Sequence, residues 1–291
     1  MPQSRVDRVP APFLVLGAII SVQFGSAVAR TLFDDLGAAG VTLLRLALAA
    51  VLLLVLLRPA VRRWPRSSWS AALLLGTAMA GMNLVFYLAL RTVPLGIAVT
   101  VEFIGPLLLA LVQTRRWLDL LWALAAAAGV VLLGAEPGPG VALSGLALAL
   151  LAGLFWAGYI VASARVGQEL PGADGLAVAL GFAALLVLPF GLGDVAVVLD
   201  HPHLLLAGGA VAILSSILPY GMELSALRRI PTRVFGILMS LEPAVAALAG
   251  WLVLDQRLGQ RGAAALVLVS LASVGVTLGR RNGGRSPQPL E

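Results

Sequence analysis

The 291-residue chain contains no cysteine, no lysine and only two histidines, His201 and His203. Without cysteine there are no disulfides, thiolate metal sites or cysteine nucleophiles. Two histidines on either side of Pro202 are too few for a typical histidine metal centre or a Ser-His-Asp triad. A phosphate-binding loop of the GxxxxGK[ST] kind is missing too, which excludes ATP hydrolysis by this chain. The sequence therefore indicates no metal and no cofactor.

Charged residues are also scarce. They make up 12% of the chain, against 60% hydrophobic residues, whereas a soluble domain carries about 25% charged residues. Because so few charges cannot cover the surface of a globular protein in water, the composition excludes an ordinary soluble enzyme. It predicts an integral membrane protein with the lipid bilayer as its surroundings.

Ten apolar runs have about the 20 residues that a helix needs to cross a bilayer. The runs are continuous rather than alternating, so they predict helices and not barrel strands. The predicted spans are Phe13–Ala29, Gly37–Leu57, Ser70–Leu90, Pro94–Gln113, Trp117–Gly134, Val141–Ser163, Gly175–Leu192, His203–Leu227, Arg233–Leu254 and Gly262–Gly279. The first run also resembles a signal peptide ending at Ala29, but the internal repeat described below requires it as a span.

The distribution of arginine predicts the orientation. With the N-terminus inside, fifteen arginines fall in inside segments and four in outside segments, and Arg45 lies within a span. Cytoplasmic loops collect arginine, so we expect both termini to be cytoplasmic. The positive charge is then a topology signal and not a nucleic-acid footprint. The polar tail 280–291 is rich in glycine and proline and is expected to be disordered.

The two halves of the chain resemble one another. A shift of 137 residues places Arg91 on Arg228, and it places Pro94 and Pro106 on later prolines, Pro231 and Pro243. A unit of five spans is odd in number, so two copies cross the membrane in opposite directions. We therefore predict an all-α integral membrane fold of ten transmembrane helices in a 5+5 inverted-topology repeat. The predicted parts are an N-terminal segment 1–11, repeats 12–137 and 138–279, and the tail 280–291. Such repeats are typical of alternating-access carriers, with a binding site near the midplane.

Three stretches carry a resemblance to a known family. Residues 83–94 (NLVFYLALRTVP), 154–159 (LFWAGY) and 240–243 (SLEP, followed by Gly250-Trp251) resemble the EamA branch of the drug/metabolite transporter superfamily. The likeness covers residues 11–280, and residues 94–119 are similar to the RhtA-type threonine/homoserine exporters. The chain departs from the pattern at Asp255-Gln256, where the family often has Gly-Glu. The resemblance implies a ten-helix carrier that moves small metabolites, often amino acids, outward across the bacterial inner membrane.

Two glutamates fall deep within predicted spans. Glu102 lies about 12 Å into its span, near the middle of a ~30 Å hydrocarbon core. An ionisable group at that depth costs about 2.5–3.5 kcal/mol, so it is expected to be paired or used. Pro106 cannot donate to the carbonyl of residue 102, and a carboxyl beside a free carbonyl suits an ammonium group or a proton. Glu242, next to Pro243, is a candidate for either gating and structure or direct binding.

Arg45 and Glu223 have several interpretations. Arg45 can hold a substrate carboxylate, pair with Glu102 to join helices, or reach the outside surface at Asp34 and Asp35. Glu223 lies near the cytoplasmic end of its span, a turn from Arg228 and Arg229, which predicts a surface ion pair.

Neutral polar and aromatic side chains complete the candidate binding site. Asn83 and Tyr87 share one helix face, and so do Trp156 and Tyr159. Such faces either line a cavity or form helix–helix hydrogen bonds. The candidate substrate-binding residues are Glu102, Asn83, Tyr87, Trp156, Tyr159, Tyr220 and Gln23, and the candidate gating or structural residues are Glu242, Pro106, Pro243 and Arg45.

The preferred functional hypothesis is a secondary carrier that exports small amino acids such as threonine or homoserine, driven by proton exchange at Glu102. A second hypothesis changes only the cargo, to aromatic amino acids, nucleosides or cationic drugs. A passive channel is a third. An intramembrane enzyme would have only Glu102 and Glu242 as paired catalytic groups, so we predict that the chain is not an enzyme. The sequence gives no indication of oligomeric state.

Overall fold

The computed structural model describes residues 9–113, 117–135, 141–170, 172–227, 229–230 and 232–279. Within these residues all regular structure is helical. A helix satisfies its own backbone N–H and C=O groups in lipid, which explains why apolar runs of this length fold as helices. The predicted disordered tail 280–291 and residues 1–8 of the predicted N-terminal segment lie outside the described residues.

The helices follow one another with short connections. The first part of the chain forms α1 (Ala11–Thr31), α2 (Phe33–Leu57), α3 (Arg66–Ala89), α4 (Leu95–Glu102), α5 (Ile104–Gln113) and α6 (Trp117–Ala135). The second part forms α7 (Leu143–Glu169), α8 (Asp174–Val195), α9 (His203–Ala212), α10 (Leu218–Leu227), α11 (Thr232–Met239), α12 (Glu242–Leu254) and α13 (Gln260–Gly279). Between them lie the 3₁₀ turns η2 (Val61–Arg63) and η3 (Ala196–Leu199) and the π turn η4 (Ile213–Ile217).

Nine helical segments in the described part of the chain are long and apolar enough to cross a membrane. They correspond to nine of the ten predicted spans, which confirms an all-helical membrane protein with many crossings. The remaining predicted span, Trp117–Gly134, corresponds to α6, whose apolar stretch Leu120–Leu133 is shorter. The count of ten therefore stays a prediction.

Three predicted spans are interrupted. In His203–Leu227 the π turn η4 separates α9 from α10, and two other spans are each divided beside a glutamate. One residue separates α4, which ends at Glu102, from α5, and two residues separate α11 from α12, which begins at Glu242. Pro106 and Pro243 follow the two breaks. Because proline has no N–H to donate, each removes one hydrogen bond from the helical ladder. The two glutamates consequently lie at helix ends rather than inside continuous helices.

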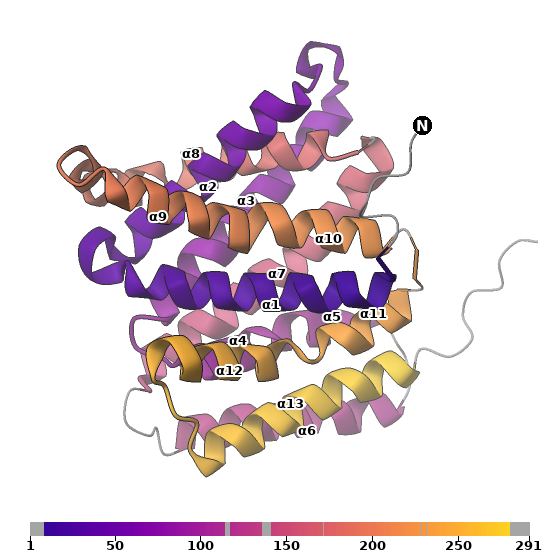
Figure 1. The fold of residues 1–291 in the computed structure, drawn as a ribbon. Coiled ribbons are helices and arrows are strands. Elements are labelled where there is room, and N and C mark those ends of the chain that lie inside the picture. Colours follow the sequence, from indigo (N-terminus) through magenta and orange to yellow (C-terminus); the bar gives the residue numbers. More distant parts are fainter. Residues whose placement is uncertain are drawn as a thin grey trace, which may run out of the picture.

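The helices pack in a bundle whose centre is formed by α1, α3, α4, α7 and α12 (Figure 1). α3 packs against α7 and α8, α2 packs against α8, and α6 lies beside α13 at one edge. Glycine allows the backbones to approach where α5 crosses α7. A Cβ added to Gly105 would lie 1.7 Å from the carbonyl oxygen of Gly153, and one added to Gly153 would lie 2.3 Å from the carbonyl oxygen of Glu102.

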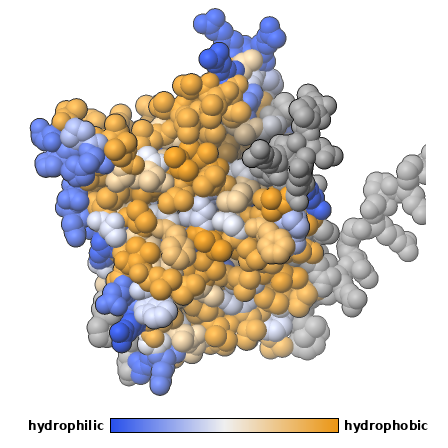
Figure 2. Space-filling model, viewed as in Figure 1, coloured by the Kyte–Doolittle hydropathy of each residue, from blue (hydrophilic) through white to orange (hydrophobic). Residues whose placement is uncertain are grey.

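The surface is consistent with a lipid environment. Hydrophobic residues cover a broad band over the helices, and hydrophilic residues gather at the edges, near helix ends and loops (Figure 2). Val112 exposes 82% of its surface and Leu206 exposes 78%. Apolar surface of this extent is unfavourable in water, and lipid chains remove it from water.

Candidate functional site

Six buried polar side chains from five helices form one cluster at the centre of the bundle. Each exposes 8% of its surface or less. We call this set the polar cluster, and its members are Gln23 of α1, Arg45 of α2, Asn83 and Tyr87 of α3, Glu102 of α4 and Glu242 of α12. All six are sequence-predicted site residues, and the structure brings them together from distant parts of the chain.

Arg45 connects α2 to α3. Its Nη1 donates a hydrogen bond of 2.7 Å to the hydroxyl of Tyr87, and its Nη2 donates to Oδ1 of Asn83. The guanidinium carbon also lies 5.1 Å from the centre of the Tyr87 ring, within cation–π range. Among the described residues, Nε of Arg45 has no hydrogen-bond partner. One N–H donor of a buried cation is therefore unpaired in this part of the chain.

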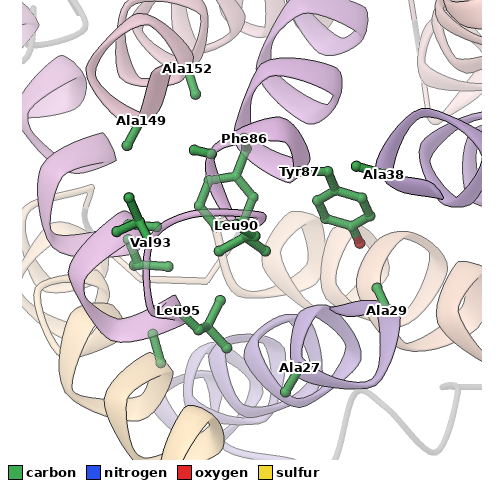
Figure 3. Close-up of a cluster of buried hydrophobic side chains, with 14 of the residues drawn as sticks. Ala27, Ala29, Ala38, Phe86, Tyr87, Leu90, Val93, Leu95, Ala149 and Ala152 are labelled. Carbon is green, nitrogen blue, oxygen red and sulfur yellow. The ribbon is translucent and has the colours of Figure 1, made fainter. Parts of the chain in front are cut away.

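The partners of Arg45 are themselves held in place. Nδ2 of Asn83 donates to the carbonyl of Met79 at 2.7 Å, one turn earlier in α3, which directs Oδ1 toward the guanidinium. Tyr87 extends from α3 between Ala29 of α1 and Ala38 of α2 (Figure 3). Small residues on both sides leave room for its ring, so the hydroxyl reaches Arg45.

Gln23 and Glu242 form a second connection, between α1 and α12. Nε2 of Gln23 donates to Oε1 of Glu242 at 3.1 Å. The other oxygens of the pair, Oε1 of Gln23 and Oε2 of Glu242, are buried and have no hydrogen-bond partner among the described residues. The pair thus presents two free acceptors, whereas Arg45 presents a free donor.

Glu102 lies between these two connections. Its carboxylate interacts electrostatically with both Glu242 and Arg45. It is the last residue of α4, where Pro106 leaves the backbone carbonyl of residue 102 without its usual donor. The Arg45 guanidinium donates its hydrogen bonds to Asn83 and Tyr87 in the described part of the chain, so Arg45 is anchored without Glu102.

The predicted aromatic residues lie around the cluster at different distances. Tyr220 of α10 interacts with Arg45 and Glu102, and its ring centre is 6.2 Å from that of Tyr159 in α7. Trp156 of α7 packs edge-on against Phe103, the residue after Glu102, with 5.3 Å between the ring centres, in a separate apolar cluster. Tyr220 and Tyr159 therefore extend the site, and Trp156 borders it.

One further acidic residue lies near the cluster, and its predicted surface ion pair stays a prediction. Glu223, predicted as half of a surface ion pair, is partly buried and interacts electrostatically with Glu242 and Tyr159. Of its two predicted partners, Arg228 lies outside the described residues. The sequence did contain a signal that Glu223 points inward. It lies three residues after Tyr220, so the two side chains share one helix face.

Other features of the described chain do not form a competing site. A surface groove between α3, α5 and α7 is lined by apolar residues such as Leu74, Leu109 and Leu154, as expected of a lipid-facing surface. No three histidine, cysteine, aspartate or glutamate side chains come together as metal ligands in the part of the chain that the structure describes. Gln256, which stands at the departure from the family pattern, accepts a 2.8 Å hydrogen bond from the N–H of Leu95 and so caps α4.

Comparison with known proteins shows the family to which the chain belongs. Residues 143–278 match the EamA-like transporter family. The threonine/homoserine exporter RhtA of Salmonella typhimurium (strain SL1344) is 43% identical over 293 residues, which cover 99% of this chain and 98% of that protein. RhtA of Escherichia coli (strain K12) is 42% identical over 268 residues, which cover 91% of this chain and 90% of that protein. A protein crystal structure with 20% identity shares the fold, with a TM-score of 0.60 over 92% of this chain and 96% of that chain. On identity of this level over almost its full length, the chain belongs to the EamA-like transporter family and is a multi-pass membrane transporter rather than an enzyme.

Proposed function

We propose that this chain is a secondary carrier that exports threonine, homoserine or amino acids of similar size across the bacterial inner membrane. The observation that carries the proposal is the 42–43% identity with threonine/homoserine exporters over nine-tenths or more of both chains. The polar cluster agrees with it in chemistry, since it contains free acceptors and a free donor, and an amino acid is a zwitterion with groups of both kinds. This pairing of charges favours a zwitterionic cargo over a purely cationic drug.

The proposed architecture is ten spans in two inverted repeats, 12–137 and 138–279, with both termini cytoplasmic. The positions of the helix breaks support it. A shift of 137 residues places the break at Phe103 on Ser240, in the break between α11 and α12. It also places the first residue of α4, Leu95, on the first residue of α11, Thr232. Two halves that break their helices at equivalent positions are expected of a repeat, although residues 228 and 231 in this region lie outside the described part.

In the proposed bound state the two ends of the amino acid contact opposite sides of the cluster. Nε of Arg45 donates to the carboxylate, for which a guanidinium is a strong partner. The ammonium group lies at Glu102, where the carboxyl, the freed carbonyl and the C-terminal end of α4 all carry negative or partly negative charge. Asn83, Tyr87, Gln23 and Tyr220 complete the polar lining, with Tyr159 and Trp156 on the apolar side.

The cluster is buried, so a substrate reaches it only after helices move. This agrees with alternating access, in which the site opens to one side of the membrane at a time. We propose that Glu102 releases its proton inside and binds it outside, in exchange for the substrate ammonium. Glu242 with Pro243, and Pro106, then act at the helix breaks as gating or structural residues.

Uptake into inverted vesicles tests the proposal. The interior of such a vesicle corresponds to the outside of the cell, so an acidic interior should drive saturable threonine uptake. Replacing Glu102 with glutamine removes one charge-assisted contact, and we expect uptake to fall about tenfold or more and to lose its dependence on the proton gradient. Glu169→Gln is the matched control, because Glu169 lies exposed at the end of α7 with Ser67 as its partner.

The outcomes separate the alternatives. Unchanged uptake and unchanged pH dependence in Glu102→Gln would refute the role of this carboxyl. Flux that never saturates and ignores the gradient would indicate a passive channel. Resistance of overproducing cells to toxic dyes, without resistance to homoserine, would indicate a different cargo.

A further inference from the structure

The π turn η4 interrupts the helix between α9 and α10. The N–H of Leu218 donates to the carbonyl of Ile213, five residues earlier instead of four. Pro219 follows and has no N–H to continue the ladder. The carbonyl of Leu214, five residues before this proline, instead accepts a 2.7 Å hydrogen bond from the hydroxyl of Ser21 in α1. The turn is thus fixed to α1 by a side chain, and π turns of this kind frequently occur at functional sites.

Two serine hydroxyls of this turn are buried without a partner. Ser215 exposes 2% of its surface and Ser216 exposes none, and neither Oγ has a hydrogen-bond partner among the described residues. A buried hydroxyl is normally satisfied, because one that is not has lost its hydrogen bonds to water without replacement. Two adjacent exceptions in one π turn therefore point to a ligand that supplies the missing partners.

The π turn lies beside the polar cluster. It packs against α1 and α2, the helices that carry Gln23 and Arg45. Ser215 faces α1, since a Cβ added to Gly25 would lie 2.3 Å from its Oγ, on the α1 face that also carries Ser21. Ser216 lies about one helical turn before Tyr220, and Tyr220 interacts with Arg45. Ser216 therefore lies on the helix face of Tyr220, which interacts with both Arg45 and Glu102, and Ser215 lies between the π turn and α1.

We propose that Ser215 and Ser216 form the subsite for the side-chain hydroxyl of the exported amino acid, and that they set its selectivity. This inference rests on the proposed function. A hydroxyl both donates and accepts, so a substrate hydroxyl can satisfy two serines at once, one as donor and one as acceptor. An isostere with a methyl group in that place leaves both serines unpartnered. A site that is built to hydrogen-bond a hydroxyl discriminates strongly against such an analogue.

The test compares substrates that differ only in this group. Valine is threonine with a methyl group in place of the hydroxyl, and norvaline stands in the same relation to homoserine. The measurement is kcat/KM for uptake of all four amino acids by inverted vesicles, for the wild type, Ser216→Ala and Ser215→Ala/Ser216→Ala. We expect the threonine/valine and homoserine/norvaline ratios to fall about fivefold for one lost hydrogen bond and further for two, with valine and norvaline uptake little changed.

Ser270→Ala is the matched control. Its hydroxyl is also buried without a partner among the described residues, but it lies on α13, which packs mainly against α6 and α11. We expect its ratios to equal those of the wild type. Unchanged ratios in the double variant, or an equal fall in Ser270→Ala, would overturn the subsite while leaving the exporter proposal intact. A wild type that takes up neither threonine nor homoserine would overturn both.

Discussion

Gly153 and Gly167 lie on the same helix, α7, and the structure predicts opposite effects for the same substitution at the two positions. A Cβ at Gly153 would lie 2.3 Å from the carbonyl oxygen of Glu102, whereas a Cβ at Gly167 would meet nothing within 4 Å. The atoms that a new methyl group at Gly153 meets belong to backbone, so they cannot rotate away. The helices must instead separate at the residue that carries the carboxyl of the polar cluster.

The magnitude follows from two opposing terms. Alanine is favoured over glycine inside a helix by about 1 kcal/mol, and this gain applies at both positions. Overpacking typically costs about 1–3 kcal/mol, and a contact with backbone belongs at the upper end. We therefore expect Gly153→Ala to lower the stability of the transporter by about 2 kcal/mol, and Gly167→Ala to raise it by up to about 1 kcal/mol.

Thermal or denaturant unfolding of the two purified variants in the same detergent measures this difference, and threonine uptake by reconstituted vesicles shows whether the site moves with the helix. Gly153→Ala should reduce uptake even at temperatures where it stays folded, because Glu102 is displaced. If both variants unfold together with the wild type, the close crossing of α5 and α7 is not present in the protein and the reasoning fails.

Two further substitutions test the contacts of the cluster and of its supports. Arg45→Lys keeps the charge but loses the planar fork that reaches Tyr87 and Asn83 from separate nitrogens, and it loses the Nε–H donor. We therefore expect threonine uptake to fall about tenfold, while Arg165→Lys on the exposed face of α7 has no effect. Equal uptake by Arg45→Lys and the wild type would contradict the anchoring role. Gln256→Ala removes the hydrogen bond to the N–H of Leu95, so we expect the free energy of unfolding to fall by about 1 kcal/mol. Gln168→Ala, at an exposed position of α7, is the control and should not change it in the same unfolding experiment.

Much of the site was predictable because burying a polar residue in lipid is costly. Arg45, Asn83, Glu102 and Glu242 stand out within apolar runs, and a residue of that kind is expected to face other protein groups. The structure agrees by placing all four in one cluster. Their individual roles stay predictions, since contacts alone do not distinguish a residue that binds substrate from one that joins helices.

Other parts could not be predicted because they depend on contacts between distant segments. The pairing of Gln23 with Glu242 joins α1 to α12, and nothing local to either residue indicates it. Ser215 and Ser216 look like ordinary small residues of a helix, and only the proline at position 219 hinted at irregular backbone. Small-residue spacings are frequent in this glycine- and alanine-rich chain, so the crossing at Gly105 and Gly153 could not be selected from among them.

The two helix breaks have a mechanical consequence. A membrane helix with a complete ladder tilts as a rigid rod, so any displacement at one face of the bilayer is transmitted to the other. Pro106 and Pro243 each remove one backbone hydrogen bond, so the helix is weakened close to Glu102 and Glu242 and can bend there. We therefore predict that the two halves of each broken helix can tilt separately. In the proposed inverted repeat, one pair of half-helices would then open toward each side of the membrane, while Glu102 and Glu242 keep nearly the same positions.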